Sequence, residues 1–348
     1  MLLFLLFLLT NSCIIYTRSP HRPDKKIPKI TTCWINNSKK KYGLINSHLE
    51  EYPIFQTFNK PYFNKHLLPS FKISFRNNTK QSIEGKELST ILEKAINELF
   101  LGKKQLTDFN IIHKKNFNKK KCYGLLVLEY KNYPFIVKLF IENPESFTKP
   151  YTKGFEPIFF FNMAGGINRH LMGFTRIKNK EMIVQKIKKS RKWSKIIDTP
   201  RKWFWLPDNK KHNRWIKIVG NNIGNKKSIE TVIPGTYAII TDKILSKKEL
   251  SIFNRKNRKF CMELCNYLDM AIDPNINNFI LEKNTDKMVI VDTEHFPSLV
   301  GFKEKQTFSG YINWILSLMS KCAYDQFFRT KSEQIAAQTK KSDFHLYY

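Results

Sequence analysis

Three polar residues around one short hairpin constrain this chain more than any other feature of its sequence. Asp273 and Asn278 precede the apolar stretch Phe279–Leu281, and Asp292 directly follows a second apolar stretch, Met288–Val291. Two short apolar stretches separated by a polar turn predict an antiparallel hairpin. That single hairpin would supply all three polar side chains.

These residue types suit phosphoryl transfer. In such sites one Asp orients or deprotonates the attacking hydroxyl, while an Asn and a second Asp hold the metal ions that neutralise the nucleotide phosphates. We therefore interpret Asp273 as the candidate catalytic base, and Asn278 and Asp292 as candidate metal ligands. The alternative is an acidic hairpin without chemistry, because a chain rich in Asp and Asn produces such spacings by chance.

A second predicted hairpin lies upstream and carries a lysine. Tyr123–Tyr130 and Tyr133–Ile141 are rich in alternating apolar residues and are separated by a Lys-Asn turn. Lys138 lies inside the second of these strands. It is the candidate for binding nucleotide phosphates, and the alternative is a lysine that extends its ammonium group to water.

Together these motifs resemble the protein-kinase-like superfamily over about residues 105–330. The Asp292-Thr-Glu sequence is closer to the aminoglycoside-kinase-like and choline-kinase-like phosphotransferases than to protein kinases, which usually have Asp-Phe-Gly. The family commonly has His two residues before the catalytic Asp, where this chain has Ala271. The resemblance implies a two-lobed α+β fold, with a β-rich N-terminal lobe and a reduced helical C-terminal lobe. It also implies ATP and Mg²⁺ as cofactors and phosphate transfer to an unknown protein or small-molecule acceptor.

The family also pairs the strand lysine with a Glu on the next helix. Residues 155–164 predict a short helix, with Glu156 near its start. Because Pro157 disfavours helical angles at the residue before it, Glu156 would begin or cap this helix. Glu156 is the candidate partner that helps to bind the nucleotide, and Glu142 and Glu145 stay as alternatives.

Other helix boundaries follow from local signals. Gly165-Gly166 predicts a helix end, and a basic helix is expected over Lys180–Ser190. Ser246-Lys-Lys-Glu249 has the pattern of a capping box, so a helix is expected from there to about Ala271. Ser89–Leu101 predicts a further helix.

One element of the family pattern is missing. The stretch Asn116–Cys122 is dominated by Lys and Asn and has no repeated glycine that would let backbone amides approach phosphate. Together with Ala271, this gap favours the main alternative, a catalytically inactive kinase-like (pseudokinase) binding module.

The charge of the chain favours anionic partners. It has 60 Lys and Arg against 29 Asp and Glu, a formal net charge of +31. The basic residues are scattered and accompanied by much Asn and Ile, so an AT-rich genome is our preferred explanation. A basic nucleic-acid-binding protein is therefore only the third hypothesis, after the active and the inactive kinase.

The chain begins with an apolar run, Met1–Leu9, which is too short to span a bilayer comfortably. It predicts a signal peptide or short anchor and hence an exported bacterial protein, secreted or anchored, with membrane contact only through this segment. The expected organisation is a signal peptide or anchor (1–19), a polar extension or linker (20–85), an N-terminal-lobe-like region (86–240), a C-terminal-lobe-like region (241–330) and a tail (331–348).

Overall fold

The computed structural model describes residues 31–37, 40–46, 60–114, 117–120, 122–141, 165–209, 212, 215–222, 225–297, 302 and 304–320. The N-terminal apolar run, the expected C-terminal tail and the expected helix at 155–164 lie outside these residues. Within the described part of the chain, no helix has the length and apolarity needed to cross a membrane.

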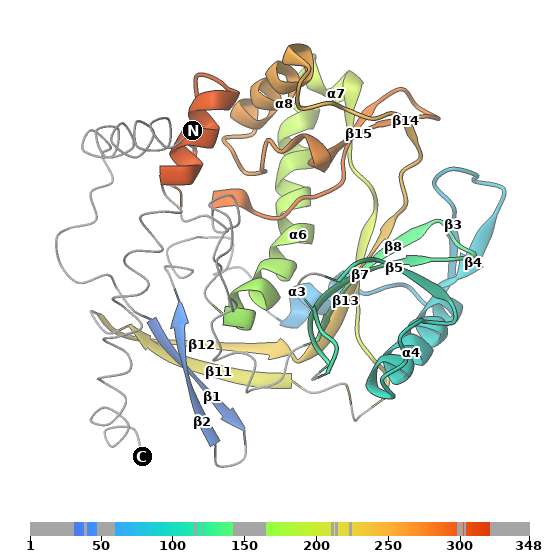
Figure 1. Cartoon of the computed structure of the whole chain (residues 1–348), viewed down its shortest axis with the longest axis vertical. Coiled ribbons are helices and arrows are strands. Elements are labelled where there is room, and N and C mark those ends of the chain that lie inside the picture. The colour runs from blue at the N-terminus through green and yellow to red at the C-terminus, as the bar shows by residue number, and fades with distance from the viewer. Residues whose placement is uncertain are drawn as a thin grey trace.

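The fold is α+β, as the sequence predicts, and it contains a large antiparallel sheet (Figure 1). The strand order of this sheet is β10-β13-β8-β7-β5, and β6 pairs with the start of β7. The predicted upstream hairpin is confirmed as β7 and β8. The strands are β5 (Phe109–His113), β6 (Phe117–Asn118), β7 (Tyr123–Tyr130), β8 (Phe135–Ile141), β10 (Lys202–Trp205) and β13 (Thr236–Asp242), and the helices that pack on them are α4 (Gly85–Phe100) and α6 (Gly165–Lys188).

The two faces of this sheet are covered by different helices. Leu139 of β8 belongs to a core cluster with Leu88, Leu92 and other residues of α4. Because side chains alternate along a strand, the neighbouring Phe140 faces the opposite side, where its ring lies 4.7 Å from that of Tyr237. Phe174 of α6 stacks on the same tyrosine at 4.4 Å. All seven residues of β13 are buried because the strand is central and covered on both faces.

A second core lies around the predicted downstream hairpin, which is confirmed as β15 and β16. Its sheet has the order β14-β15-β16-β9, with β16 and β9 parallel. Ile183 and Ile187 from the last turns of α6 join this core, so α6 runs from the large sheet to the second core (Figure 1). The elements are α7 (Trp193–Ile196), β9 (Ile197–Asp198), β14 (Ser246–Lys248), α8 (Arg255–Tyr267), the 3-10 helix η2 (Ile276–Asn278), β15 (Phe279–Glu282), β16 (Met288–Ile290) and a helical stretch at 311–320.

The structure corrects the expected polar extension over its described residues 60–84. Phe63 and Ile73 are buried, and residues 60–84 pack against the rest of the fold because their apolar side chains complete its core. The elements in this part are α3 (Lys60–Lys65), β3 (Lys72–Ser74) and β4 (Ser82–Glu84), and a further sheet of order β12-β11-β1-β2 joins β1 (Thr31–Asn37), β2 (Lys40–Asn46), β11 (Trp215–Asn222) and β12 (Asn225–Pro234).

Two expected helix boundaries are wrong. Residues 246–248 form a strand because their backbone pairs with β15, and α8 begins only at Arg255. The side chain of Asn254 caps this helix by accepting hydrogen bonds from the backbone N–H groups of Lys256 and Asn257 at 2.9 and 3.4 Å. The glycine pair at 165–166 opens α6 and does not end a helix.

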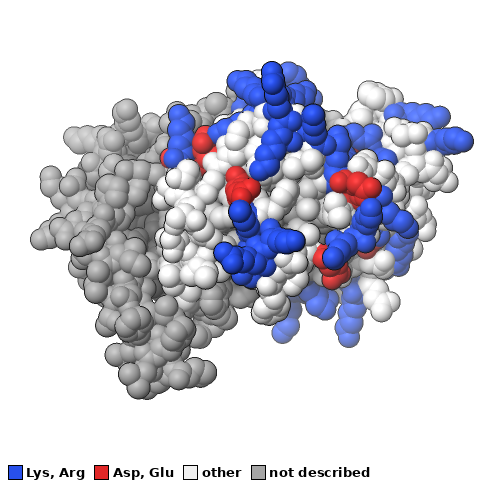
Figure 2. Space-filling model, turned by 90° about the horizontal axis from the view of Figure 1, so that it is seen from above, with Lys and Arg blue, Asp and Glu red and all other residues white. Residues whose placement is uncertain are grey.

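Charge is unevenly distributed over the surface. The end of the molecule that carries α7 and α8 is seen in Figure 2, where Lys and Arg side chains predominate and few Asp or Glu side chains lie among them. This face of the described residues therefore has a net positive charge.

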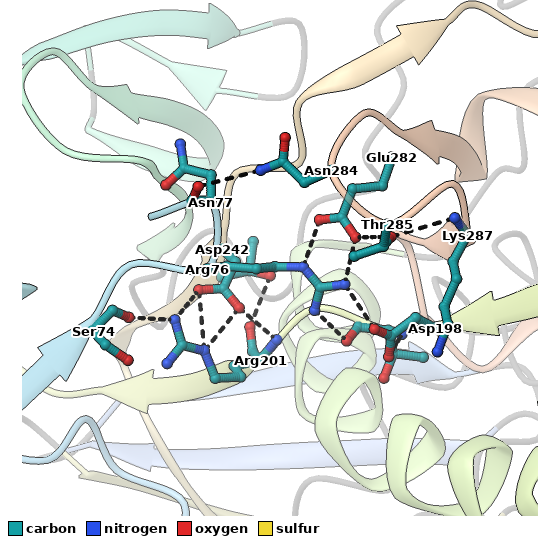
Figure 3. Close-up of polar contacts among 12 residues, drawn as sticks. Ser74, Arg76, Asn77, Asp198, Arg201, Asp242, Glu282, Asn284, Thr285 and Lys287 are labelled. Carbon is teal, nitrogen blue, oxygen red and sulfur yellow. Dashed lines mark hydrogen bonds and ion pairs between the residues drawn. The ribbon is translucent and has the colours of Figure 1, made fainter. Parts of the chain in front are cut away.

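Arg76, two residues after β3, forms ion pairs with two strands of the second sheet (Figure 3). Arg76 donates through Nε to Glu282 of β15 at 2.7 Å and through Nη2 to Asp198 of β9 at 2.8 Å. Close by, Arg201 binds Asp242 at the end of β13 at 2.7 Å. The ion pairs of Arg76 attach the residue after β3 to β9 and β15. The ion pair of Arg201 with Asp242 joins the chain just before β10 to the end of β13.

Candidate functional site

Lys138 and Asp292 meet although 154 residues separate them in sequence. The Nζ atom of Lys138 lies 2.7 Å from Oδ2 of Asp292. Lys138 lies two residues before Phe140 on β8. Its side chain therefore projects to the same face of the sheet, which α6 covers. Asp292 lies two residues after the end of β16. About a fifth to a quarter of each side chain is exposed, 19% for Lys138 and 26% for Asp292, so solvent reaches the pair.

Asp273 and Asn278 lie on the turn that leads into β15. The amide nitrogen of Asn278 donates to the carbonyl oxygen of Asp273 at 3.1 Å, and a carboxylate oxygen of Asp273 accepts from the backbone N–H of Asn275 at 2.9 Å. The backbone N–H of Val291 donates to the carbonyl oxygen of Asn278 at 2.9 Å. The turn is therefore attached to the residue before Asp292, and the predicted residues Lys138, Asp273, Asn278 and Asp292 are brought into one region.

The environment of Asp273 changes its acidity. Burial raises the pKa of its carboxyl to about 7, and the negative charges of Asp292 and Glu294 act in the same direction. A hydrogen bond from the backbone of Asn275 opposes the increase. A carboxyl group with a pKa near neutrality can accept a proton at physiological pH and also release it.

Arg176 of α6 is a site residue that the sequence did not reveal. Its Nε lies 3.2 Å from Oδ1 of Asp292, and its Nη2 lies 2.9 Å from Oε1 of Glu294. The side chain is only 5% exposed, and its Nη1 atom is buried without a hydrogen-bond partner among the residues that the structure describes. A buried guanidinium donor without a partner costs free energy, which a bound acceptor such as a phosphate oxygen would recover.

Lys202 of β10 lies on the other side of the same loop. Its Nζ donates to the carbonyl oxygen of Val291 at 3.0 Å and to Oγ1 of Thr293 at 2.7 Å. Burial lowers the pKa of Lys202 well below its usual range. Asn179 of α6 donates to the carbonyl oxygen of Ala271 at 2.8 Å. This amide holds the loop at Ala271.

The positive charges determine the state of Asp292. Burial alone would raise the pKa of its carboxyl, but Arg176, Lys138 and Lys202 outweigh this effect and hold the pKa below its usual range. Asp292 is therefore ionised at neutral pH. It is an acceptor whose negative charge is already balanced by two direct ion pairs.

The proposed metal ligands fit Mg²⁺ only in part. Asp292 supplies a carboxylate, and Asn278 would use its Oδ1, because its amide nitrogen is bound to Asp273. Among the described residues, no group of three or more His, Cys, Asp or Glu side chains could hold a metal ion by itself. Mg²⁺ is commonly held by one or two carboxylates together with substrate phosphates and water, so these two residues would need the nucleotide to complete the site.

The partner glutamate of Lys138 stays a prediction, because Glu156, Glu142 and Glu145 lie outside the described residues. The sequence also gave no reason to select Arg176 or Lys202, since a single basic residue on a helix or strand has no distinctive spacing. Only the apolar neighbours of Lys202, Trp203 to Trp205, indicated a strand that buries its side chains.

Comparisons with family models, with curated proteins and with solved structures find no match to this chain.

Proposed function

We propose that this protein is a kinase-like phosphotransferase that binds ATP with Mg²⁺ and transfers the terminal phosphoryl group to an unknown acceptor. The observation that carries the proposal is the meeting of Lys138 with Asp292, next to the turn that presents Asp273 and Asn278. Each of these residues has the type and the chain order that phosphoryl transfer requires.

The arrangement of strands supports the proposal. In protein kinases the phosphate-binding Lys lies on the third strand of the N-terminal lobe. In the large sheet described above, β5, β7 and β8 are consecutive paired strands, and Lys138 lies on the third of them. The two hydrophobic cores, one around the large sheet and one around α8 and β15, would correspond to the two lobes.

The chemistry of the residues supports distinct roles. Asp273, with a pKa of about 7, would accept the proton of the acceptor hydroxyl. Lys138 and the unpartnered Nη1 of Arg176 would bind phosphate oxygens. Asp292 and Asn278 would hold Mg²⁺, which neutralises phosphate charge when bound.

The second candidate is a catalytically inactive kinase-like module. The observation in its favour is that both carboxylate oxygens of Asp292 are already engaged, Oδ2 by Lys138 and Oδ1 by Arg176. A metal ion at Asp292 would have to compete with these two cations. In this case the site would bind a nucleotide or another phosphate compound without transferring it.

A thermal-shift titration with ATP, with and without Mg²⁺, tests the proposal. Binding stabilises a protein by RT ln(1 + [L]/Kd), about 2.7 kcal/mol at a hundredfold excess over Kd. We expect Lys138→Met to remove most of the ATP shift and Asp273→Asn to keep it while losing phosphoryl transfer. Asp286→Asn is the matched control, because this carboxylate is 66% exposed on the β15–β16 turn.

The outcomes separate the two candidates. ATP binding with Mg²⁺-dependent transfer to any acceptor, lost in Asp273→Asn, supports the active enzyme. ATP binding without phosphoryl transfer, in both the wild type and Asp273→Asn, supports the inactive module. If ATP produces no shift in the wild type with or without Mg²⁺, neither proposal stands.

A further inference from the structure

We infer that the surface formed by residues 186–195 and 245–263 is a docking surface for membranes rich in anionic phospholipids. We call it the basic face. The inference is independent of the proposed phosphoryl transfer, because it uses none of the residues assigned to that site.

The basic face concentrates positive charge. Residues 186–195 contain six Lys or Arg and no Asp or Glu, and residues 245–263 contain six Lys or Arg and two Glu. Some of these charges are paired, as in Lys186 with Asp269 at 2.6 Å and Lys192 with Glu263 at 3.3 Å. The remainder make no ion pair with another described residue, and they are Lys188, Lys189, Arg191, Lys195, Lys248, Arg255, Lys256 and Arg258.

The two segments lie side by side. The ring of Trp193 in α7 packs against that of Phe260 in α8, with centroids 5.7 Å apart, and Lys192 reaches Glu263. This is the end of the molecule seen in Figure 2, where blue side chains predominate. Adjacent segments of one sign add their fields, so this face would attract an anionic surface.

An apolar loop projects from the basic face. Phe253 is 91% exposed and Ile252 is 48% exposed, just before the first turn of α8. The loop is held in this position by its own hydrogen bonds: the side chain of Arg258 donates to the carbonyl oxygen of Ile252 at 2.5 Å, and the backbone N–H of Phe253 donates to Oγ of Ser251 at 3.2 Å. Two adjacent large apolar side chains in water are unfavourable, and the loop geometry keeps them there.

Exposed apolar residues flanked by Lys and Arg fit a lipid surface. The apolar side chains would enter the boundary between headgroups and acyl chains, and the basic residues Arg255 and Lys256 would meet lipid phosphates and carboxylates. Single-stranded nucleic acid is the weaker fit. It is bound by several aromatic side chains on which successive bases stack. Between residues 245 and 263 Phe253 is the one largely exposed aromatic residue, and its neighbour Ile252 has no ring to stack.

The test uses the full chain and cosedimentation with two kinds of vesicle, phosphatidylcholine alone and phosphatidylcholine mixed with phosphatidylserine. The N-terminal apolar run is present in the wild type and in every variant, so any vesicle binding that it causes is the same in all of them. We expect binding to the mixed vesicles to weaken about tenfold or more in Phe253→Ser, because the benefit of burying the ring is lost. We expect roughly a 25-fold loss in the double variant Arg255→Gln/Lys256→Gln, at about fivefold for each charge removed.

Matched controls come from α4 and the residues just after it, and α4 lies well apart from α8 in Figure 1. Leu101→Ser removes an apolar side chain that is 78% exposed, and Lys86→Gln/Lys104→Gln removes two exposed charges. Both controls should bind the mixed vesicles as the wild type does. All variants should keep the wild-type midpoint of urea unfolding.

Three results would overturn the inference. The first is equal binding to both kinds of vesicle, and the second is loss of binding in the controls to the same degree as in the variants of the basic face. The third is tight binding of single-stranded RNA that Phe253→Ser abolishes, without preference for phosphatidylserine, which would assign the face to nucleic acid.

Discussion

The acidity of Asp273 leads to a prediction about the pH dependence of stability. The pKa of this carboxyl is raised from 3.8 to about 7, mainly by burial. The folded protein therefore binds this proton more tightly than the unfolded chain does. The stabilising effect of the proton is complete below about pH 4 and is lost as the pH rises toward and through 7. Asp273→Asn has an uncharged side chain of the same shape and cannot lose this contribution.

The magnitude follows from the size of the shift. A change of roughly three pKa units corresponds to about 4 kcal/mol, at about 1.4 kcal/mol per unit. Solvent contact at the edge of the turn would reduce this value, so a gain of about 2–4 kcal/mol is expected. The variant should match the wild type near pH 4 and exceed its free energy of unfolding by this amount at pH 8.

Urea unfolding of both proteins across this pH range measures the effect. The difference between the two proteins at each pH isolates Asp273 from the other titrating groups, and Asp286→Asn serves as the exposed control. A difference that does not change with pH would refute the reasoning. A variant that becomes less stable than the wild type as the pH rises would show that the ionised carboxylate is favourable in the fold.

Three further predictions concern contacts of the described fold. Gly173→Ala should destabilise the protein by about 1–3 kcal/mol, because an added Cβ would overlap side chains of β8 and β13, whereas Gly310→Ala, with open space around it, should have no effect in the same urea assay. Arg76→Met should cost about 3–5 kcal/mol, because it leaves the buried carboxylate of Glu282 without its partner, and the double variant with Glu282→Met should recover much of the loss. Asp292→Asn should remove the Mg²⁺-dependent part of the ATP thermal shift, and an equal Mg²⁺ effect in wild type and variant would exclude Asp292 as a ligand.

Local patterns predicted the hairpins well. The strands β7 and β8, and likewise β15 and β16, follow from apolar stretches bounded by polar turns. Such hairpins are encoded by residues close in sequence, so their pairing needs no information from the rest of the chain. The sequence alone also shows the residue types of the candidate site and their order along the chain, which are Lys138, Asp273, Asn278 and Asp292.

Helix boundaries were predicted less well, because local signals compete with tertiary pairing. Ser246 to Glu249 satisfies a capping pattern, yet its backbone finds partners in β15 and forms a strand instead. The pair Gly165-Gly166 is permissive at either end of a helix, and α6 begins there. For residues 246–248, the conformation that forms depends on a strand about 35 positions away in the sequence.

The sequence by itself determined the candidate residues, the two hairpins that carry them and the α+β class. Only the tertiary structure decided that Lys138 contacts Asp292, that Arg176 and Lys202 surround the same carboxylate, and that Asp273 is buried enough to raise its pKa. The physical reason is that charge pairing and desolvation depend on distances of a few ångströms between residues that belong to different elements of the chain. No local pattern records such distances, and the packing of α6 against the large sheet and the second core contributes to them.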